Sequence, residues 1–282
     1  MKAAERIAGV LGIGQLPMRT RLPQYTYADL LGRVAQAALA DAEVDAEDID
    51  GLILAMAPTT TLGIDEPHFW ALAGLPGADR FLGRVHTLAS SGLVAFRLAC
   101  SYVAAKRAKR VLVVAADLAD EAPDLIGAIT AMADPFAPRQ YPGNAATAHA
   151  FQAAAYMARN GLDERDMAHV IVKNRANGVD NQYAQLRQGV THDEVLASPV
   201  LSWPIKRLEA SPRTSGAAAV LVGPPDDGRN FLRRKPLLFG RQQIAEMLRA
   251  VLKGVWHGAR RVGVGYWAAG SIPFGHGEQG VK

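Results

Sequence analysis

VHTLASSGLVAFRLACSYVAAKRAKRVLVVAAD, residues 85–117, is the stretch that decides the fold of this chain. It predicts a strand at Phe81–His86, a turn of small residues, a helix at Ser90–Lys106 and a second strand at Arg110–Ala116. Arg97 is the only charge in the first four turns of the helix, and apolar residues cover most of the remaining surface. A helix that is apolar nearly all round is buried. The stretch therefore predicts a buried central helix between two strands.

The turn that starts this helix, Ser90-Ser91-Gly92, carries the chemical interest. The N-terminus of a helix has a partial positive charge, and its free N–H groups favour an oxyanion or an activated nucleophile. Ser90 allows two interpretations. A serine nucleophile needs a paired base, because its hydroxyl is hardly ionised near neutral pH, whereas an N-cap serine only satisfies the helix end.

The rest of the chain alternates strands with helices, which predicts an α/β fold with a mostly parallel, covered sheet. Apolar residues at helical spacing, capping residues and apolar runs give the boundaries. The predicted elements are strands at Arg6–Ile13, Gly51–Ala57 and Ala217–Val222, and helices at Glu66–Ala73, Tyr27–Ala42, Ala145–Asn160, Leu162–Asn177 and His192–Ala197. Between them, Pro123–Gly143 is proline-rich and predicts an irregular substrate or subunit loop.

Composition narrows the class of protein. The chain has 282 residues, of which 49% are hydrophobic and 21% charged, so it can bury a large core. No run of about 18 apolar residues predicts a membrane span, and no signal peptide is apparent at the start. The one cysteine cannot form an internal disulfide, which favours a reducing cytoplasm.

The net charge of +4 is unevenly distributed. Residues 224–282 hold ten Lys/Arg and four Asp/Glu, and the remainder of the chain is slightly acidic. The body therefore gives no reason to propose nucleic acid as a partner. Glycines at positions 9, 12 and 14 raise the question of a nicotinamide site, but their spacing is not that of the dinucleotide fingerprint.

Several stretches, in this order, are similar to the thiolase superfamily. They are Gly12-Ile13-Gly14, Asp48-Ile49-Asp50-Gly51-Leu52, Ala89-Ser90-Ser91-Gly92, Val172-Lys173-Asn174-Arg175, Tyr183-Ala184-Gln185 and Ser211-Pro212 with Ser215-Gly216-Ala217. Over residues 5–223 the chain resembles the sterol-carrier-protein-x type of thiolase within that superfamily, an acetyl-CoA acetyltransferase-like protein. The resemblance implies a βαβαβαββ unit whose buried helix forms the central layer of a five-layer domain that dimerises.

The implied chemistry is acyl transfer, or Claisen formation and cleavage of carbon–carbon bonds, on acyl-CoA. A cysteine at the start of the central helix would carry the acyl group, but this chain has Ala89 at that position. The alternatives for catalysis are Ser90 and His86, although a histidine at a strand end is often satisfied by backbone. Cys100 lies about three turns into the helix and is expected to be a core residue.

The resemblance also assigns substrate binding to Ser91, Gly92, Ser215 and Gly216. Ser215 stands where the family usually has an acid. The resemblance further implies a CoA thioester as substrate and no permanently bound cofactor, and no pair of histidines predicts a metal site.

The resemblance implies a second βαβαβαββ unit after Gly223, but 59 residues follow, with one predicted helix at Arg241–Val255 and one strand at Val262–Ala268. We therefore expect a thiolase-like unit at 1–223, a short basic tail at 224–282 and a largely missing second half. A thiolase-like acyltransferase impaired by Ala89 is the first functional hypothesis. The alternative is a non-catalytic subunit that pairs with itself, as a homodimer, or with a complete thiolase, because uncovered apolar surface favours a partner.

Overall fold

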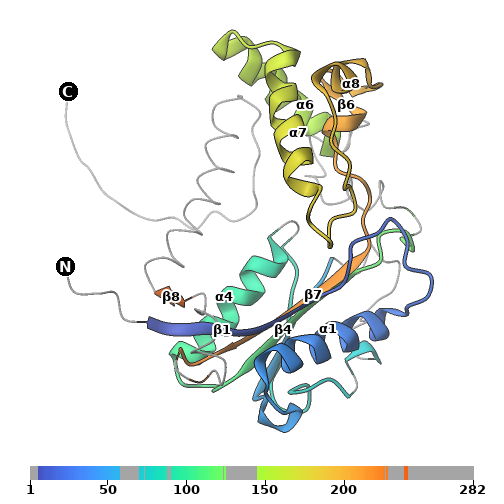
Figure 1. The fold of residues 1–282 in the computed structure, drawn as a ribbon. Coiled ribbons are helices and arrows are strands. Elements are labelled where there is room, and N and C mark those ends of the chain that lie inside the picture. The colour runs from blue at the N-terminus through green and yellow to red at the C-terminus, as the bar shows by residue number, and fades with distance from the viewer. Residues whose placement is uncertain are drawn as a thin grey trace, which may run out of the picture.

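The computed structural model describes residues 6–57, 70–72, 74–87, 90–122, 124, 145–225, 227 and 238–240. These residues form a layered α/β body and a smaller lobe (Figure 1). The chain enters the lobe after strand β4 (Val111–Asp117) and leaves it before strand β7 (Gly216–Gly223). Among the described helices, none is long and apolar enough to cross a membrane.

Six described strands form one mixed sheet in the order β3-β2-β4-β7-β1-β8. Their bounds are β1 Arg6–Gln15, β2 Gly51–Ala55, β3 Leu82–Val85, β4 Val111–Asp117, β7 Gly216–Gly223 and β8 Leu238–Gly240. β2 pairs in parallel with β3 and β4, and β7 lies antiparallel between β4 and β1. β1, β2, β3 and β4 therefore run in one direction, and β7 and β8 run in the other. The strand β8, antiparallel to β1, has no counterpart in the sequence prediction.

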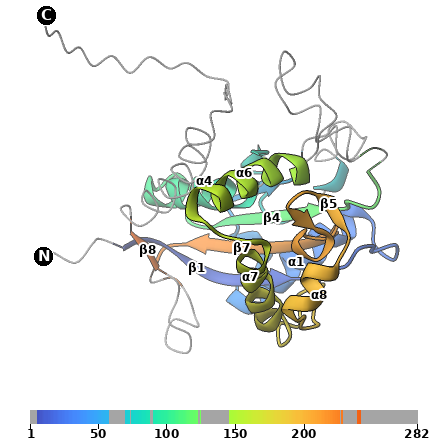
Figure 2. The same ribbon diagram turned by 90° about the horizontal axis from the view of Figure 1, so that it is seen from above.

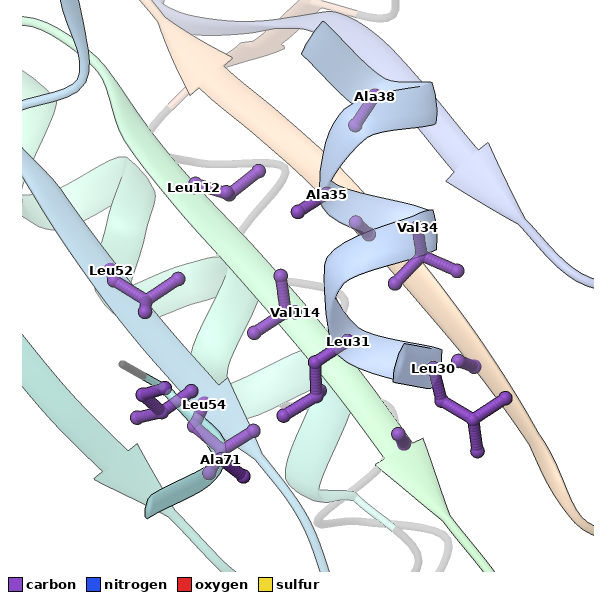
Figure 3. Close-up of a cluster of buried hydrophobic side chains, with 14 of the residues drawn as sticks. Leu30, Leu31, Val34, Ala35, Ala38, Leu52, Leu54, Ala71, Leu112 and Val114 are labelled. Atoms are coloured by element: carbon purple, nitrogen blue, oxygen red, sulfur yellow. The ribbon is translucent and has the colours of Figure 1, made fainter. Parts of the chain in front are cut away.

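Helix α1 (Tyr27–Ala42) covers one face of the sheet and has the bounds that its periodicity predicts. A capping box between Thr26 and Asp29 fixes its start. Figure 3 shows its apolar stripe pointing at leucine and valine side chains of β2 and β4. The labelled members of this buried cluster are Leu30, Leu31, Val34, Ala35, Ala38, Leu52, Leu54, Ala71, Leu112 and Val114.

Two glycines of β1 explain how closely α1 packs on the sheet. A Cβ atom at Gly12 would collide with the carbonyl oxygen of Ala38, and one at Gly14 with that of Val34. The helix backbone thus lies directly on the strand, which only glycine allows. The Gly12-Ile13-Gly14 motif is therefore a packing motif.

Helix α4 (Ser91–Ala104) covers the opposite face and is the central helix that the sequence predicts. Its side toward the sheet buries Ser91 and a row of small and apolar residues: Ala95, Ala99, Cys100 and Val103. Arg97 and Ser101 are exposed on its outer side. Figures 1 and 2 show α1 and α4 on opposite sides of the strands.

The lobe consists of α6 (Ala145–Asn160), α7 (Glu164–Gly178), α8 (His192–Ala197) and a hairpin of β5 (Val200–Ser202) and β6 (Ile205–Lys206). The three helices agree with the sequence prediction, and Asp163 caps the start of α7. The hairpin was not predicted. Its Lys206 is buried and forms an ion pair with Glu164, which also accepts a hydrogen bond from Trp203 Nε1 at 2.9 Å.

Figure 1 shows the lobe above the sheet, over the part where β7 begins, and in Figure 2, seen from above, the lobe lies in front of the strands. Four predicted segments lie mostly or wholly outside the described residues. They are the helix Glu66–Ala73, the loop Pro123–Gly143, the helix Arg241–Val255 and the strand Val262–Ala268. The start of the tail is held to the body by Asp227, which pairs with Arg110 at 2.7 Å and with Lys109 at 3.4 Å.

Candidate functional site

The strands bring the predicted site residues to one edge of the sheet. Ala55 of β2 lies opposite Val85 of β3 and Ala115 of β4, so the carboxyl ends of these three strands are adjacent. Gly216, the first residue of β7, pairs with Asp117 at the same edge. The turn from β3 into α4 also starts here, and ligands of open α/β sheets bind at such strand ends.

A compact hydrogen-bond network shapes this turn. Ser90 Oγ donates to the carbonyl oxygen of Thr87 at 2.9 Å and lies 3.1 Å from Thr87 Oγ1. The backbone N–H of Thr87 donates to Ser91 Oγ at 2.9 Å. Ser91 is buried, and Ala89 lies outside the described residues.

Ser90 occupies the N-cap position of α4, but its side chain accepts no hydrogen bond from the helix. Within the described residues, both hydrogen bonds of its hydroxyl go to Thr87, and neither goes to a base. His86 is exposed. Among the described hydrogen bonds, none joins His86 to the hydroxyl of Ser90, and the side chain of Ser90 does not cap α4.

The other residues assigned to substrate binding have different surroundings. Gly92 is exposed, and a Cβ atom there would meet nothing within 4 Å. At Gly216 a Cβ atom would meet the side chain of Met18, which packs directly against this glycine. The assignments of Ser91, Gly92, Ser215 and Gly216 to a substrate stay predictions.

Cys100, the one thiol of the chain, is buried on the sheet side of α4. Burial raises the pKa of its thiol to about 12. A thiol with such a pKa is almost entirely protonated at neutral pH and is a poor nucleophile. The expectation that Cys100 is a core residue is confirmed.

Asp117 is a feature of this edge that the sequence prediction missed. Its Oδ1 accepts a hydrogen bond from the backbone N–H of Ala57 at 3.0 Å, which joins the ends of β4 and β2. Burial raises the pKa of this carboxyl to about 6, and the Ala57 hydrogen bond opposes that shift. Carboxyls with such values are candidates for proton transfer near neutral pH. An acid that ends a fully apolar strand was the available signal.

Tyr27 approaches the same strand end from α1. Its hydroxyl donates to the carbonyl oxygen of Ala116 at 3.0 Å. Burial first, and then the negative charge of Asp117, raise the pKa of this hydroxyl well above its usual value, while Arg84 lowers it. Tyr27 is therefore a neutral hydrogen-bond donor that fixes α1 to β4.

Ser215 is fully buried and donates to Asp120 Oδ1 at 2.5 Å. Asp120 Oδ2 in turn lies 3.4 Å from Arg21 Nε. The loop after β4 thus places the carboxylate of Asp120 against the hydroxyl of Ser215. Arg19 and Ser215 also exchange two backbone hydrogen bonds, which hold the segment after β1 against the segment before β7.

Gln185, from the family-like motif at 183–185, connects the lobe to this junction. Its Nε2 donates to Thr20 Oγ1 at 2.7 Å, and its Oε1 accepts from Thr214 Oγ1 at 2.8 Å. The backbone N–H of Met18 donates to the carbonyl oxygen of Tyr183. Gln185 therefore positions the lobe at the sheet edge.

The described residues contain no group of three or more His, Cys, Asp or Glu side chains that could hold a metal ion. The described part of the edge thus combines a helix N-terminus that its N-cap side chain does not satisfy, a carboxyl with a raised pKa and a buried polar junction. Such an arrangement can stabilise negative charge on a carbonyl oxygen and can move a proton.

No protein-family model matches the chain. Two curated relatives, both named acetyl-CoA acetyltransferase, come from Methanocaldococcus jannaschii and Methanothermobacter thermautotrophicus. Each is 26% identical to this chain, over 83% and 80% of it and over 60% and 59% of the relative. The benzoylsuccinyl-CoA thiolase subunit BbsB of Thauera aromatica is 29% identical over 32% of this chain and 23% of its own length.

Solved structures share the fold. The Ltp2-ChsH2(DUF35) aldolase has a TM-score of 0.64 at 22% identity and covers 79% of this chain and 57% of that chain. A monomeric SCP2-thiolase like protein from Mycobacterium smegmatis has a TM-score of 0.61 at 19% identity, over 79% and 47%. Human mitochondrial 3-ketoacyl-CoA thiolase in complex with CoA has a TM-score of 0.60 at 15% identity, over 83% and 68%.

The mixed sheet with a helix layer on each face defines an α/β protein of the thiolase fold. The sequence matches and the shared fold together support a thiolase-superfamily protein that is similar to the N-terminal half of its relatives. It spans about 60% of the length of the curated relatives that it matches.

Proposed function

We propose that the chain binds an acyl-CoA, or a related acyl thioester, at the sheet edge beside the N-terminus of α4, and that it has lost acyl transfer through a cysteine. The observation that carries the proposal is the N-terminus of α4 at the carboxyl ends of β2, β3 and β4, two residues after Ala89 in the sequence. Relatives named acetyl-CoA acetyltransferase support the substrate class. No permanent cofactor is part of the proposal, and a cytoplasmic location stays a prediction.

The helix start supplies the electrostatic part of the site. The hydroxyls of Ser90 and Ser91 both bond to Thr87, so the N-cap side chain does not accept from the first-turn N–H groups. These N–H groups and the helix dipole favour negative charge on an oxygen at the N-terminal end of the helix. A thioester carbonyl oxygen gains such charge when its carbon is attacked or when its α-carbon loses a proton.

Acyl transfer through a covalent thioester needs a thiolate at the N-terminal end of the helix. The sequence has Ala89 where the resemblance expects the cysteine, and Cys100 is buried, which raises the pKa of its thiol. Chemistry at this site is therefore restricted to steps that form no acyl-cysteine. One structural neighbour is named an aldolase, and aldol cleavage needs a base and an oxyanion site but no acyl-enzyme.

The second candidate is a non-catalytic subunit that pairs with itself or with a complete thiolase. Ile13 alternates with Gly12 and Gly14, so it points to the α4 face of the sheet, where its side chain is 58% exposed. Leu82 on the strand β3, at one end of the sheet order, is 40% exposed. A relative named a thiolase subunit also favours this candidate.

Four measurements separate the candidates. Binding of acetyl-CoA and CoA to the purified chain is measured by calorimetry, together with cleavage of acetoacetyl-CoA by CoA and mass spectrometry for a covalent acyl group. We expect acyl-CoA binding without thiolytic turnover and without acylation. Acylation of the chain would contradict the proposal that it has lost acyl transfer. A chain that binds no acyl-CoA but forms a stable dimer in light scattering would favour the non-catalytic subunit.

The Ala89→Cys variant tests whether the helix start activates a nucleophile. A thiol directly before α4 should have a lowered pKa, whereas Cys100 serves as an internal control with its raised pKa. We expect iodoacetamide to modify one thiol of the variant at pH 7, identified as residue 89 by peptide mapping, and to leave the parent chain unmodified. Equal protection of both thiols would contradict an accessible, activating helix start.

A further inference from the structure

Two histidines connect α7 to α8 in the lobe, away from the sheet edge. His192 Nε2 lies 2.7 Å from His169 Nδ1, and the two rings meet edge to face with their centroids 4.3 Å apart. His169 is exposed and His192 is half-buried. The proposed function makes no use of this pair, and no relative's name accounts for it.

The positions of the two rings are set independently by their helices. His192 is the first residue of α8, directly after the N-cap Thr191, which forms a capping box with Glu194. His169 lies in α7, whose start is fixed by a capping box between Asp163 and Asp166. Both rings therefore lie on helices whose N-termini are capped. Side chains that already contact each other lose little freedom when they bind a shared ligand.

The short contact between the rings shows which atoms face each other. A hydrogen bond between two imidazoles needs a proton on one nitrogen and a lone pair on the other. When the donor ring takes its other tautomer, with the proton on its far nitrogen, both facing nitrogens offer a lone pair to a metal ion and each ring stays neutral. Zinc–imidazole bonds of about 2.0–2.1 Å in tetrahedral geometry place the two nitrogens about 3.3 Å apart. The rings therefore need to separate by only about half an ångström from their 2.7 Å contact.

Charge near the pair is balanced. Asp193, next to His192, pairs with Arg165 at 3.3 Å, and both side chains are largely exposed. Arg165, Asp166 and Lys173 lie within one helical turn of His169 on α7. Because these two cations are matched by two carboxylates, repulsion does not prevent a cation from approaching the rings.

We propose that His169 and His192 form a two-imidazole binding site for a borderline divalent transition-metal ion such as Zn²⁺, Ni²⁺ or Cu²⁺. The described residues offer no third side chain of the metal-binding types, so water completes the coordination. The ion takes the place of the hydrogen bond between the two rings, the donor ring moves its proton to its far nitrogen, and the ion links α7 to α8. Mg²⁺ and Ca²⁺ do not bind, because they prefer oxygen ligands.

The test is calorimetric titration of the full chain with ZnCl₂ at pH 7.5, with MgCl₂ as the comparison ion. Seven histidines are present, so a matched control is essential; His149→Ala removes an exposed histidine from α6. We expect one Zn²⁺ to bind per chain. The affinity should fall at least about tenfold in His169→Ala and in His192→Ala, because each variant loses one of the two ligands. His149→Ala should bind Zn²⁺ as the unmodified chain does.

A second measurement does not depend on the folding of a variant. Electron paramagnetic resonance of the unmodified chain with one equivalent of Cu²⁺ should show two coordinated imidazole nitrogens. A spectrum without nitrogen coordination, or Zn²⁺ binding that is unchanged in folded His169→Ala and His192→Ala chains, would overturn the proposal and leave the pair as a hydrogen bond between helices. The site is independent of acyl-CoA binding, so failure of either proposal leaves the other intact.

Discussion

The two faces of the sheet are covered to different degrees. On the α1 face, glycines in β1 let the helix touch the strand, and large side chains such as Leu31 and Leu54 fill the layer. On the α4 face the buried helix residues are mostly small, and Ile13 is 58% exposed. The comparison teaches that the described α1 face is packed with larger side chains, so we expect truncations there to cost more stability than truncations on the α4 face.

Leu31→Ala on the α1 face should have the largest effect. Leu31 is fully buried, so its truncation removes apolar burial and leaves a cavity, which lowers the free energy of unfolding by about 2–5 kcal/mol. Leu98→Ala is the matched change on α4, where the side chain is half-buried, and about 1 kcal/mol is expected. Urea unfolding followed by circular dichroism compares the two variants, and equal losses would break the contrast between the faces.

Asp117→Asn should stabilise the chain in a pH-dependent way. The carboxyl has a pKa of about 6 in the folded chain and 3.8 as its ordinary value. Ionised Asp117 therefore costs stability, and the penalty appears as the pH rises through the interval from about 4 to about 6. At pH 7.5 the neutral amide should raise the free energy of unfolding by up to about 3 kcal/mol.

Below about pH 4 this advantage of Asp117→Asn should disappear, because the carboxyl is then protonated in both states. Urea unfolding at pH 7.5 and pH 4 measures the difference. A stability change of the same size at both pH values would show that burial does not raise the pKa of Asp117.

Ser215→Ala should have a smaller effect. It removes the buried hydroxyl that donates to Asp120, which leaves one carboxylate oxygen without that donor. The expected loss is about 1–3 kcal/mol. Ser101→Ala is the control, because Ser101 is an exposed serine whose hydroxyl bonds to the carbonyl oxygen of Arg97 in its own helix. Thermal unfolding of both variants measures the contrast, and a loss at Ser101 that matches the one at Ser215 would refute it.

Ser90→Ala should have the smallest effect. The hydroxyl is half-buried and makes its described hydrogen bonds with Thr87, without capping α4. A loss of about 0.5–1 kcal/mol is expected, with acyl-CoA binding largely retained. If the variant instead abolishes an acyl-transfer activity of the parent chain, Ser90 is a nucleophile.

Local patterns in the sequence predicted what local forces determine. α1 and α6 have their predicted bounds because helical periodicity specifies them, and a capping box adds to this in α1. The position of β7 between β4 and β1 was not predictable, since it depends on pairing between distant segments. The hairpin β5–β6 was missed because its strands are too short to show alternation.

At the candidate site the sequence identified the turn but not its bonding. Ser90 has a residue type that is common at N-caps, yet its hydroxyl donates a hydrogen bond to the carbonyl oxygen of Thr87 and does not cap the helix. The sequence alone does not show which of these two hydrogen bonds forms. Asp117 escaped notice because its burial arises only when the ends of β2 and β4 lie side by side. The hydrogen bond from Ser215 to Asp120 joins two residues that are 95 positions apart in the sequence, so no local pattern could predict it.

The insertion of the lobe between adjacent strands has a consequence for how the chain folds. β4 and β7 are hydrogen-bonded neighbours, yet residues 118–215 separate them. Closing so long a loop costs more entropy than a hairpin does and slows folding. A lobe that is already compact shortens the effective loop, and the Gln185 contacts with Thr20 and Thr214 hold its base against the body. We therefore expect the order of assembly to run from the lobe to the centre of the sheet.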